Sequence, residues 1–167
     1  VLLGTSRFAI RCAEAIRDSG GDLAAVVSLP ARLRPNNSAD FESFARQAGI
    51  PYVEIDDVNA RADADSLRAF SPDYLFVSWP QMLKADALAI PKRFCIGTHP
   101  TDIPLNKGRH PLHWIIALGM PETKLSFFRL DEGVDTGNVL LKVSLPVLPA
   151  DEIGTVSARM EDVGYQG

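Results

Sequence analysis

Cysteine is scarce in this sequence, and its placement excludes the common dithiol chemistry. Cys12 and Cys95 are the only two cysteines, and both have apolar neighbours. No CxxC pair is present, which excludes the usual redox motif. Two cysteines in such surroundings are more typical of buried free thiols in a reducing compartment than of a disulfide. We therefore expect two unpaired, buried thiols and a cytoplasmic location.

Long apolar runs and an excess of basic charge are also missing. No run approaches the roughly 18–20 apolar residues that span a bilayer, and no signal-peptide pattern is present. Lys and Arg together number 17 against 21 for Asp and Glu, which gives a net charge of −4. This balance offers no patch for a nucleic-acid backbone, so neither a membrane nor a nucleic acid is an expected partner. Because the chain starts at a valine and stops abruptly after Gly167, we interpret it as a trimmed view, which leaves targeting segments and a further C-terminal region open.

Apolar strand-like segments alternate with amphipathic helix-like segments along most of the chain. This alternation predicts an α/β fold, Rossmann-like, with a mostly parallel twisted sheet, helices on both faces and a C-terminal antiparallel hairpin. We expect one domain over residues 1–167, a length sufficient for a real core. The expected strands cover residues 1–3, 23–29, 51–55, 74–78, 94–98, 124–130 and 139–147. The first expected helix starts after Ser6, which is its N-cap candidate. The other expected helices cover residues 39–48, 57–70, a short stretch before residue 91, 111–118, and 151 to about 160.

All three histidines lie between residues 94 and 114, and His99 stands out among them. It follows a predicted strand and precedes a proline, at the sheet edge where open α/β sheets bind ligands. A loop histidine that merely hydrogen-bonds its surroundings remains the alternative. His110 and His113 have a spacing that could suit a metal, but no third ligand has a suitable spacing, so no metal is expected.

A second loop, residues 130–137 (LDEGVDTG), places Asp135 between Gly133 and Gly137. A carboxylate near the His99 imidazole would fix its tautomer and stabilise its protonated form, as proton transfer requires. Neither the loop at residues 99–108 nor the loop at residues 130–137 contains a serine or cysteine nucleophile. Direct attack by a substrate amine or by water is therefore favoured over a covalent intermediate.

Four motifs, in the right order, give the chain a resemblance over nearly its whole length. Residues 4–9 (GTSRFA) are similar to GTxxFA, 81–83 (QML) to QIL, 99–108 to the NxHPSLLPxxRG loop, and 130–137 to MDxGxDTG. Together they resemble the folate-dependent formyltransferases, which include methionyl-tRNA, glycinamide ribonucleotide and nucleotide-sugar N-formyltransferases.

The resemblance implies a catalytic domain that transfers a formyl group from 10-formyltetrahydrofolate to a primary amine. It makes His99 the general acid/base and Asp135 its partner. A plain core role for Met82 and Leu83 remains open. The implied folate-binding residues are Gln81, Met82, Leu83, Leu130, Asp131, Glu132, Gly133 and Val134.

Gly97 departs from the resemblance, because it stands where the family has a catalytic asparagine. Losing one such donor to the oxyanion typically costs about 10²–10³ in rate. Another donor could replace it, and we favour Asn106 over Thr98, Thr101 and Lys107. The Gly97 N–H or a water could also suffice, and we expect catalysis to be retained. A binding module without turnover is the third alternative, which an obstructed space at Gly97 would favour.

The expected acceptor is a small amine, most simply that of a nucleotide-linked sugar. Its pyrophosphate could bind to the turn at residues 4–7 or to Lys107 and Arg109. An ordinary tight turn between a strand and a helix explains residues 4–7 equally well. A methionyl-tRNA formyltransferase-like enzyme and a formyltetrahydrofolate hydrolase remain alternatives, and a homodimer is kept open. The candidate substrate-binding residues are Gly4, Thr5, Ser6, Arg7, Thr98, Thr101, Lys107 and Arg109.

Overall fold

The computed structural model describes all 167 residues and divides into two compact units, residues 1–96 and 97–167. Its seven strands are ordered β3-β2-β1-β4-β5-β6-β7 in one mixed sheet. β1 pairs in parallel with β2 and β4, and β2 with β3, whereas β6 and β7 are antiparallel. The predicted α/β fold, with a mostly parallel sheet and a C-terminal antiparallel hairpin, is confirmed. None of the helices has the length and apolar character needed to cross a membrane.

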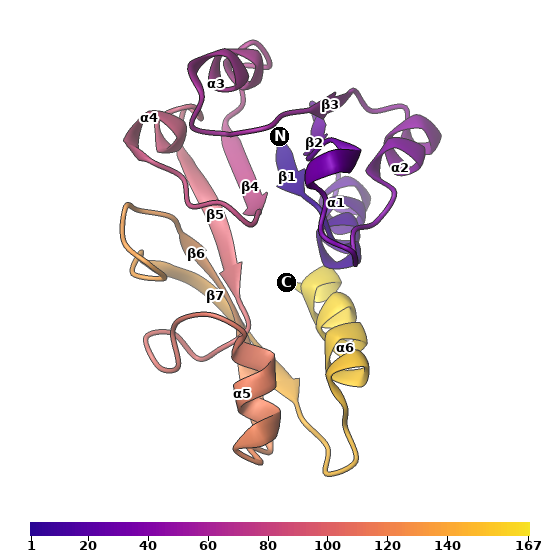
Figure 1. Cartoon of the computed structure of the whole chain (residues 1–167), viewed down its shortest axis with the longest axis vertical. Helices are drawn as coiled ribbons and strands as arrows, with labels where there is room; N and C mark the ends of the chain where they lie inside the picture. The colour runs from indigo at the N-terminus through magenta and orange to yellow at the C-terminus, as the bar shows by residue number, and fades with distance from the viewer. The chain divides into compact units, whose positions relative to one another are not determined.

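The first unit alternates short strands with helices (Figure 1). Three of its strands, at residues 2–4, 26–28 and 74–78, are largely buried apolar segments, as parallel strands covered on both faces should be, whereas the edge strand at residues 52–54 is half-buried to exposed. The elements are β1 (Leu2–Gly4), α1 (Arg7–Asp18), β2 (Val26–Ser28), a 3₁₀ turn (Ala31–Leu33), α2 (Phe41–Ala48), β3 (Tyr52–Glu54), α3 (Arg61–Arg68), β4 (Tyr74–Ser78) and α4 (Ala85–Leu88). Strand β5 (Phe94–His99) crosses from this unit into the next.

Of two local expectations in this unit, one is confirmed and one is wrong. Ser6 occupies the predicted N-cap position of α1, although its side chain makes no capping hydrogen bond. Helix α3 begins at Arg61 rather than at residue 57, so its predicted start is wrong. The Asp57 carboxylate accepts the Asn59 N–H at 3.0 Å, and the Asp63 carboxylate accepts the Asp57 N–H at 2.9 Å. These side chains give the backbone a turn in place of a helix.

The predicted thiol state is confirmed. Cys12 and Cys95 are free cysteines, 3% and 1% exposed. Their surroundings are apolar enough that burial raises the pKa of each thiol to about 12.

The second unit contains the end of β5, α5 (Pro111–Ala117), the β6–β7 hairpin (Glu122–Arg129 and Val139–Pro146) and α6 (Ile153–Gln166). α6 packs against both strands of the hairpin and against α5. It runs past residue 160, where the sequence predicted its end, because Val156 and Val163 share a buried face of the helix.

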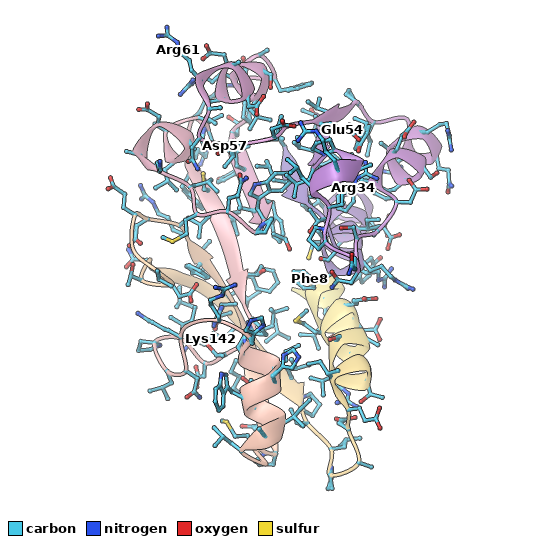
Figure 2. The ribbon with its side chains drawn as sticks, viewed as in Figure 1. Phe8, Arg34, Glu54, Asp57, Arg61 and Lys142 are labelled. Atoms are coloured by element: carbon cyan, nitrogen blue, oxygen red, sulfur yellow. The ribbon has the colours of Figure 1, made fainter.

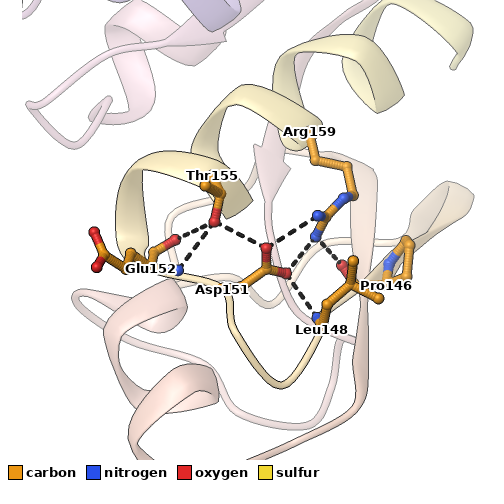
Figure 3. A network of polar contacts seen from close by, with 6 residues as sticks. All are labelled: Pro146, Leu148, Asp151, Glu152, Thr155 and Arg159. Carbon is orange, nitrogen blue, oxygen red and sulfur yellow. Dashed lines mark hydrogen bonds and ion pairs between the residues drawn. The ribbon is translucent and has the colours of Figure 1, made fainter.

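A polar network fixes the connection from β7 into α6 (Figure 3). The Asp151 carboxylate accepts two bonds from the Arg159 guanidinium, at 2.6 and 3.0 Å, and one from the Leu148 N–H at 2.6 Å. Arg159 also donates to the Pro146 carbonyl at 2.7 Å, and Thr155 donates to Asp151 at 2.9 Å. These contacts hold the Asp151 pKa far below its usual range, chiefly through Arg159 and the Leu148 N–H.

Candidate active site

His99 and Asp135, the two residues singled out from the sequence, lie together in the second unit. The distance from His99 Nδ1 to Asp135 Oδ2 is 3.6 Å, and the side chains are 10% and 18% exposed. At this separation the contact is electrostatic rather than a hydrogen bond, although such contacts can tighten when a substrate binds. The predicted proximity of the two residues is confirmed.

The other ring nitrogen of His99 has no partner within the protein. Nε2 is buried and makes no hydrogen bond, whereas Nδ1 faces the carboxylate. Buried polar atoms almost always have a partner, so an unpaired imidazole nitrogen beside a carboxylate is suited to a group brought by a ligand. The arrangement fits an imidazole that exchanges a proton through Nε2 while a carboxylate stabilises its cationic form.

The loop that carries Asp135 is held by its own side chains. Asp131 Oδ1 accepts the Gly133 N–H at 3.0 Å and the Thr136 hydroxyl at 2.6 Å. The hydrogen bond from the Thr136 hydroxyl is the main cause of the lowered Asp131 pKa, and the Gly133 N–H and the charge of Lys107 lower it further. Asp131 thus serves the loop's conformation.

Asp135 has a conformation that few residues adopt. Its φ is 51°, in the left-handed region that aspartate tolerates better than most residues. Its Oδ2 also accepts a hydrogen bond from the Gly108 N–H at 3.3 Å, which links the loop after His99 to the loop at residues 130–137. At Gly137, an added Cβ would overlap the Arg129 carbonyl, so only glycine fits where the loop rejoins the hairpin.

Polar side chains of the hairpin hold the segment that follows His99. The Thr123 hydroxyl donates to the Pro100 carbonyl at 3.1 Å, and the Ser126 hydroxyl donates to the Thr101 carbonyl at 2.6 Å. Lys142, labelled in Figure 2, donates to the Asp102 carboxylate at 2.5 Å. The sequence analysis missed these residues; the signal was a threonine and a serine next to the apolar residues of β6.

Gly97 lies against Leu130, and this contact was not foreseen. A Cβ built on Gly97 would lie 3.0 Å from Leu130 Cγ, still nearer to Cδ2, and 3.4 Å from Phe128 Cζ. The space that a side chain at position 97 would enter is therefore filled by Leu130. This is the obstruction that the sequence analysis associated with a binding module without turnover.

The other candidates of this unit differ in burial. Asn106 is exposed, with a φ of 53°, and Lys107 and Arg109 are exposed as well. Thr101 is fully buried, and its Oγ1 has no hydrogen-bond partner. Thr98 and Leu130 are half-buried, and the four loop residues 131–134 are exposed.

His110 and His113, the other two histidines of the sequence, contact each other. Both are exposed, and their rings meet edge-to-face with centroids 5.6 Å apart. His110 precedes α5 with a φ of 54°.

In the first unit, the segment around residues 81–83 is fixed by hydrogen bonds. Gln81 Oε1 accepts the Trp79 indole N–H at 3.1 Å, and Gln81 Nε2 donates to the Asp56 carbonyl at 3.0 Å. Asn59 donates to the Met82 carbonyl at 3.0 Å and accepts the Lys84 N–H at 2.7 Å. Asn59, which the sequence analysis missed, thus orders this segment.

The same segment has one exposed and one buried apolar side chain. Met82 is 56% exposed and Leu83 is 6% exposed. Leu83 therefore has the core role that the sequence analysis kept open, and Met82 is free to contact a ligand.

The opening turn of the first unit has a packing reason for its glycine. An added Cβ at Gly4 would collide with Ala9 and would lie 2.9 Å from Phe41 Cζ, so glycine allows β1 to approach both following helices. Thr5 is buried, Ser6 is half-buried and Arg7 is exposed.

Comparisons with known proteins agree with this architecture. The model of one family, described as formyl transferase, matches residues 1–167. Methionyl-tRNA formyltransferase from Geotalea uraniireducens (strain Rf4) is 31% identical over 171 residues, covering 99% of this chain and 55% of that protein. The chain thus spans about half the length of such curated relatives.

Two solved structures share the fold. Glycinamide ribonucleotide transformylase 1 from Symbiobacterium toebii superposes with a TM-score of 0.82 at 19% identity, covering 99% of this chain and 81% of that one. A formyltetrahydrofolate deformylase from Pseudomonas syringae pv. tomato str. DC3000 gives 0.79 at 18% identity, covering 99% and 56%. With its full length matched by the family model, this chain belongs to the formyl transferase family.

Proposed function

We propose that the protein transfers a formyl group from 10-formyltetrahydrofolate to a primary amine. The observation that carries this proposal is the His99–Asp135 pair: a nearly buried imidazole has one nitrogen 3.6 Å from a carboxylate and the other without a partner. Such a pair can take a proton from an attacking amine without a protein nucleophile. Membership in the family supplies the reaction class.

The proposed step balances around His99. The amine lone pair attacks the formyl carbon, and Nε2 of His99 accepts the proton that the amine loses. The bond from the formyl carbon to the folate nitrogen then breaks, and the imidazolium of His99 donates its proton to that nitrogen. Asp135 stabilises the imidazolium in between, since its carboxylate is close and largely shielded from solvent.

The first candidate acceptor is the amine of a nucleotide-linked sugar. The net charge of −4 argues against strong binding to a nucleic-acid backbone, and Lys107 and Arg109 are exposed cations in the loop that follows His99. Methionyl-tRNA is the second candidate, because relatives about 30% identical are named methionyl-tRNA formyltransferases.

Water is a third acceptor to test. One solved structure with the same fold is named a formyltetrahydrofolate deformylase. Neither His99 nor Asp135 requires the nucleophile to be an amine. Release of formate without any amine present would identify this activity.

The test measures formyl transfer from 10-formyltetrahydrofolate to a panel of nucleotide amino sugars, glycinamide ribonucleotide and methionyl-tRNA. His99→Ala is expected to lower kcat by about 10²–10⁴, the usual contribution of a general acid/base. His113→Ala, which alters an exposed histidine of the same unit, is the matched control and should leave the rate within about twofold. A His99→Ala variant with the normal rate would overturn the proposed mechanism.

A further inference from the structure

The position of Leu130 over Gly97 has a consequence for the chemistry beside His99. We propose that Leu130 occupies the space next to His99 that a side chain at position 97 would take, and that it thereby keeps a side-chain hydrogen-bond donor at that position away from the reacting formyl group. This inference rests on the proposed function, and it assigns the residue that fills this space within that site. Leu130 acts by excluding a hydrogen-bond donor; it takes no part in proton transfer.

The geometry of β5 places positions 97 and 99 on one face. Residues two apart in a strand project in the same direction, about 6.6 Å apart along the strand. The burial pattern agrees, because Gly97 and His99 are buried while Thr98 between them is half-exposed. A side chain at position 97 would therefore lie beside the imidazole of His99.

Leu130 and Phe128 close that space. A Cβ on Gly97 would be 3.0 Å from Leu130 Cγ and 3.4 Å from Phe128 Cζ, and the first distance is shorter than nonpolar atoms accept. Leu130 lies just after β6, at the start of the loop that carries Asp135. Its side chain is thus an apolar wall on the face that presents His99.

An apolar side chain at this point cannot donate a hydrogen bond to the reacting formyl group. Negative charge develops on the formyl oxygen as the amine attacks, and an amide N–H aimed at it is a common source of rate. With glycine at position 97 and leucine over it, neither residue supplies a side-chain donor. Making room for an asparagine at position 97 should therefore accelerate the reaction.

The experiment compares four variants with the wild type: Gly97→Asn, Leu130→Ala, the double variant Gly97→Asn/Leu130→Ala, and the double variant Gly97→Leu/Leu130→Ala. Leucine and asparagine have similar shapes, so the last variant refills the space without an amide. We expect Gly97→Asn/Leu130→Ala to exceed the leucine control at least tenfold in kcat, within the 10²–10³ typical of such a donor. Both single variants should be no faster than the wild type.

Thermal unfolding of the same variants tests the packing separately from activity. Gly97→Asn alone should lower Tm, and Leu130→Ala should relieve part of that loss, a coupling expected of residues in contact. Equal kcat values for the two folded double variants would overturn the inference, as would independent effects on Tm. If the wild type transfers formyl groups and the asparagine double variant gains nothing, only this inference fails. If no protein in the set consumes the formyl donor, the proposed function fails with it.

Discussion

Asp135 Oδ2 lies 3.6 Å from His99 Nδ1, and both side chains are largely shielded from water. In such surroundings a carboxylate and an imidazolium attract each other more strongly than they would on an open surface. In the proposed reaction, the Asp135 carboxylate would therefore lie beside the imidazole while that ring carries the proton.

Asp135→Asn should lower kcat by tenfold or more, up to about the 10²–10⁴ assigned to general acid–base catalysis. Asparagine tolerates the left-handed φ of 51° at this position, so the loop should keep its shape while the charge is lost. The measurement is steady-state formyl transfer together with binding of a folate analogue. Normal kcat in the asparagine variant would show that the carboxylate has no part in the reaction.

Gly137→Ala should destabilise the loop that presents Asp135. The new Cβ would overlap the Arg129 carbonyl oxygen and lie 2.8 Å from its carbon, so the backbone must move. A cost of about 1–3 kcal/mol is typical of forced overpacking, equivalent to about 2–4 °C in Tm per kcal/mol.

Gly154→Ala is the matched control for that substitution. Gly154 lies in α6 with nothing within 4 Å of an added Cβ, so alanine should add about 0.5–1 kcal/mol of stability. Thermal unfolding measures both variants. Equal Tm changes would contradict the role assigned to the Arg129 carbonyl.

Asp151→Asn should lower Tm at neutral pH, because the variant loses the charge that holds Arg159 against the β7–α6 connection (Figure 3). The folded-state pKa of Asp151 is lowered, so this group stabilises the protein above the ordinary aspartate pKa of about 3.9. That stability is lost as pH falls toward the lowered value. The Tm difference between wild type and variant should thus shrink below about pH 4. A difference that stays constant from pH 3 to 7 would contradict this account.

Both thiols should react slowly with thiol reagents in the native protein. Burial raises the pKa of Cys12 and of Cys95 to about 12, so at pH 8 almost no thiolate forms and little of either sulfur is accessible. Titration with a chromogenic disulfide reagent should show slow reaction in buffer and two rapidly reacting thiols in denaturant. Rapid labelling of the folded protein would show that one of the two surroundings opens readily.

Expectations that depend on neighbouring residues agree well with the structure. Strand β4 covers residues 74–78 as predicted, and Gly49 ends α2 in the left-handed conformation. Errors arose where a polar side chain competes with the pattern, as at Asp57, or where tertiary burial extends a helix, as at Val163. Apolar periodicity contains neither kind of information.

The sequence by itself determined the order of strands and helices, the two free thiols, the loop that follows His99 and the loop that carries Asp135. These follow from periodicity and from residue types at short spacing, which act locally along the chain. Only the tertiary structure decided that the Asp135 carboxylate approaches the His99 ring, and that Leu130 lies over Gly97. Those contacts join segments far apart in sequence, and their distances depend on strand pairing and loop conformation, which no local pattern contains.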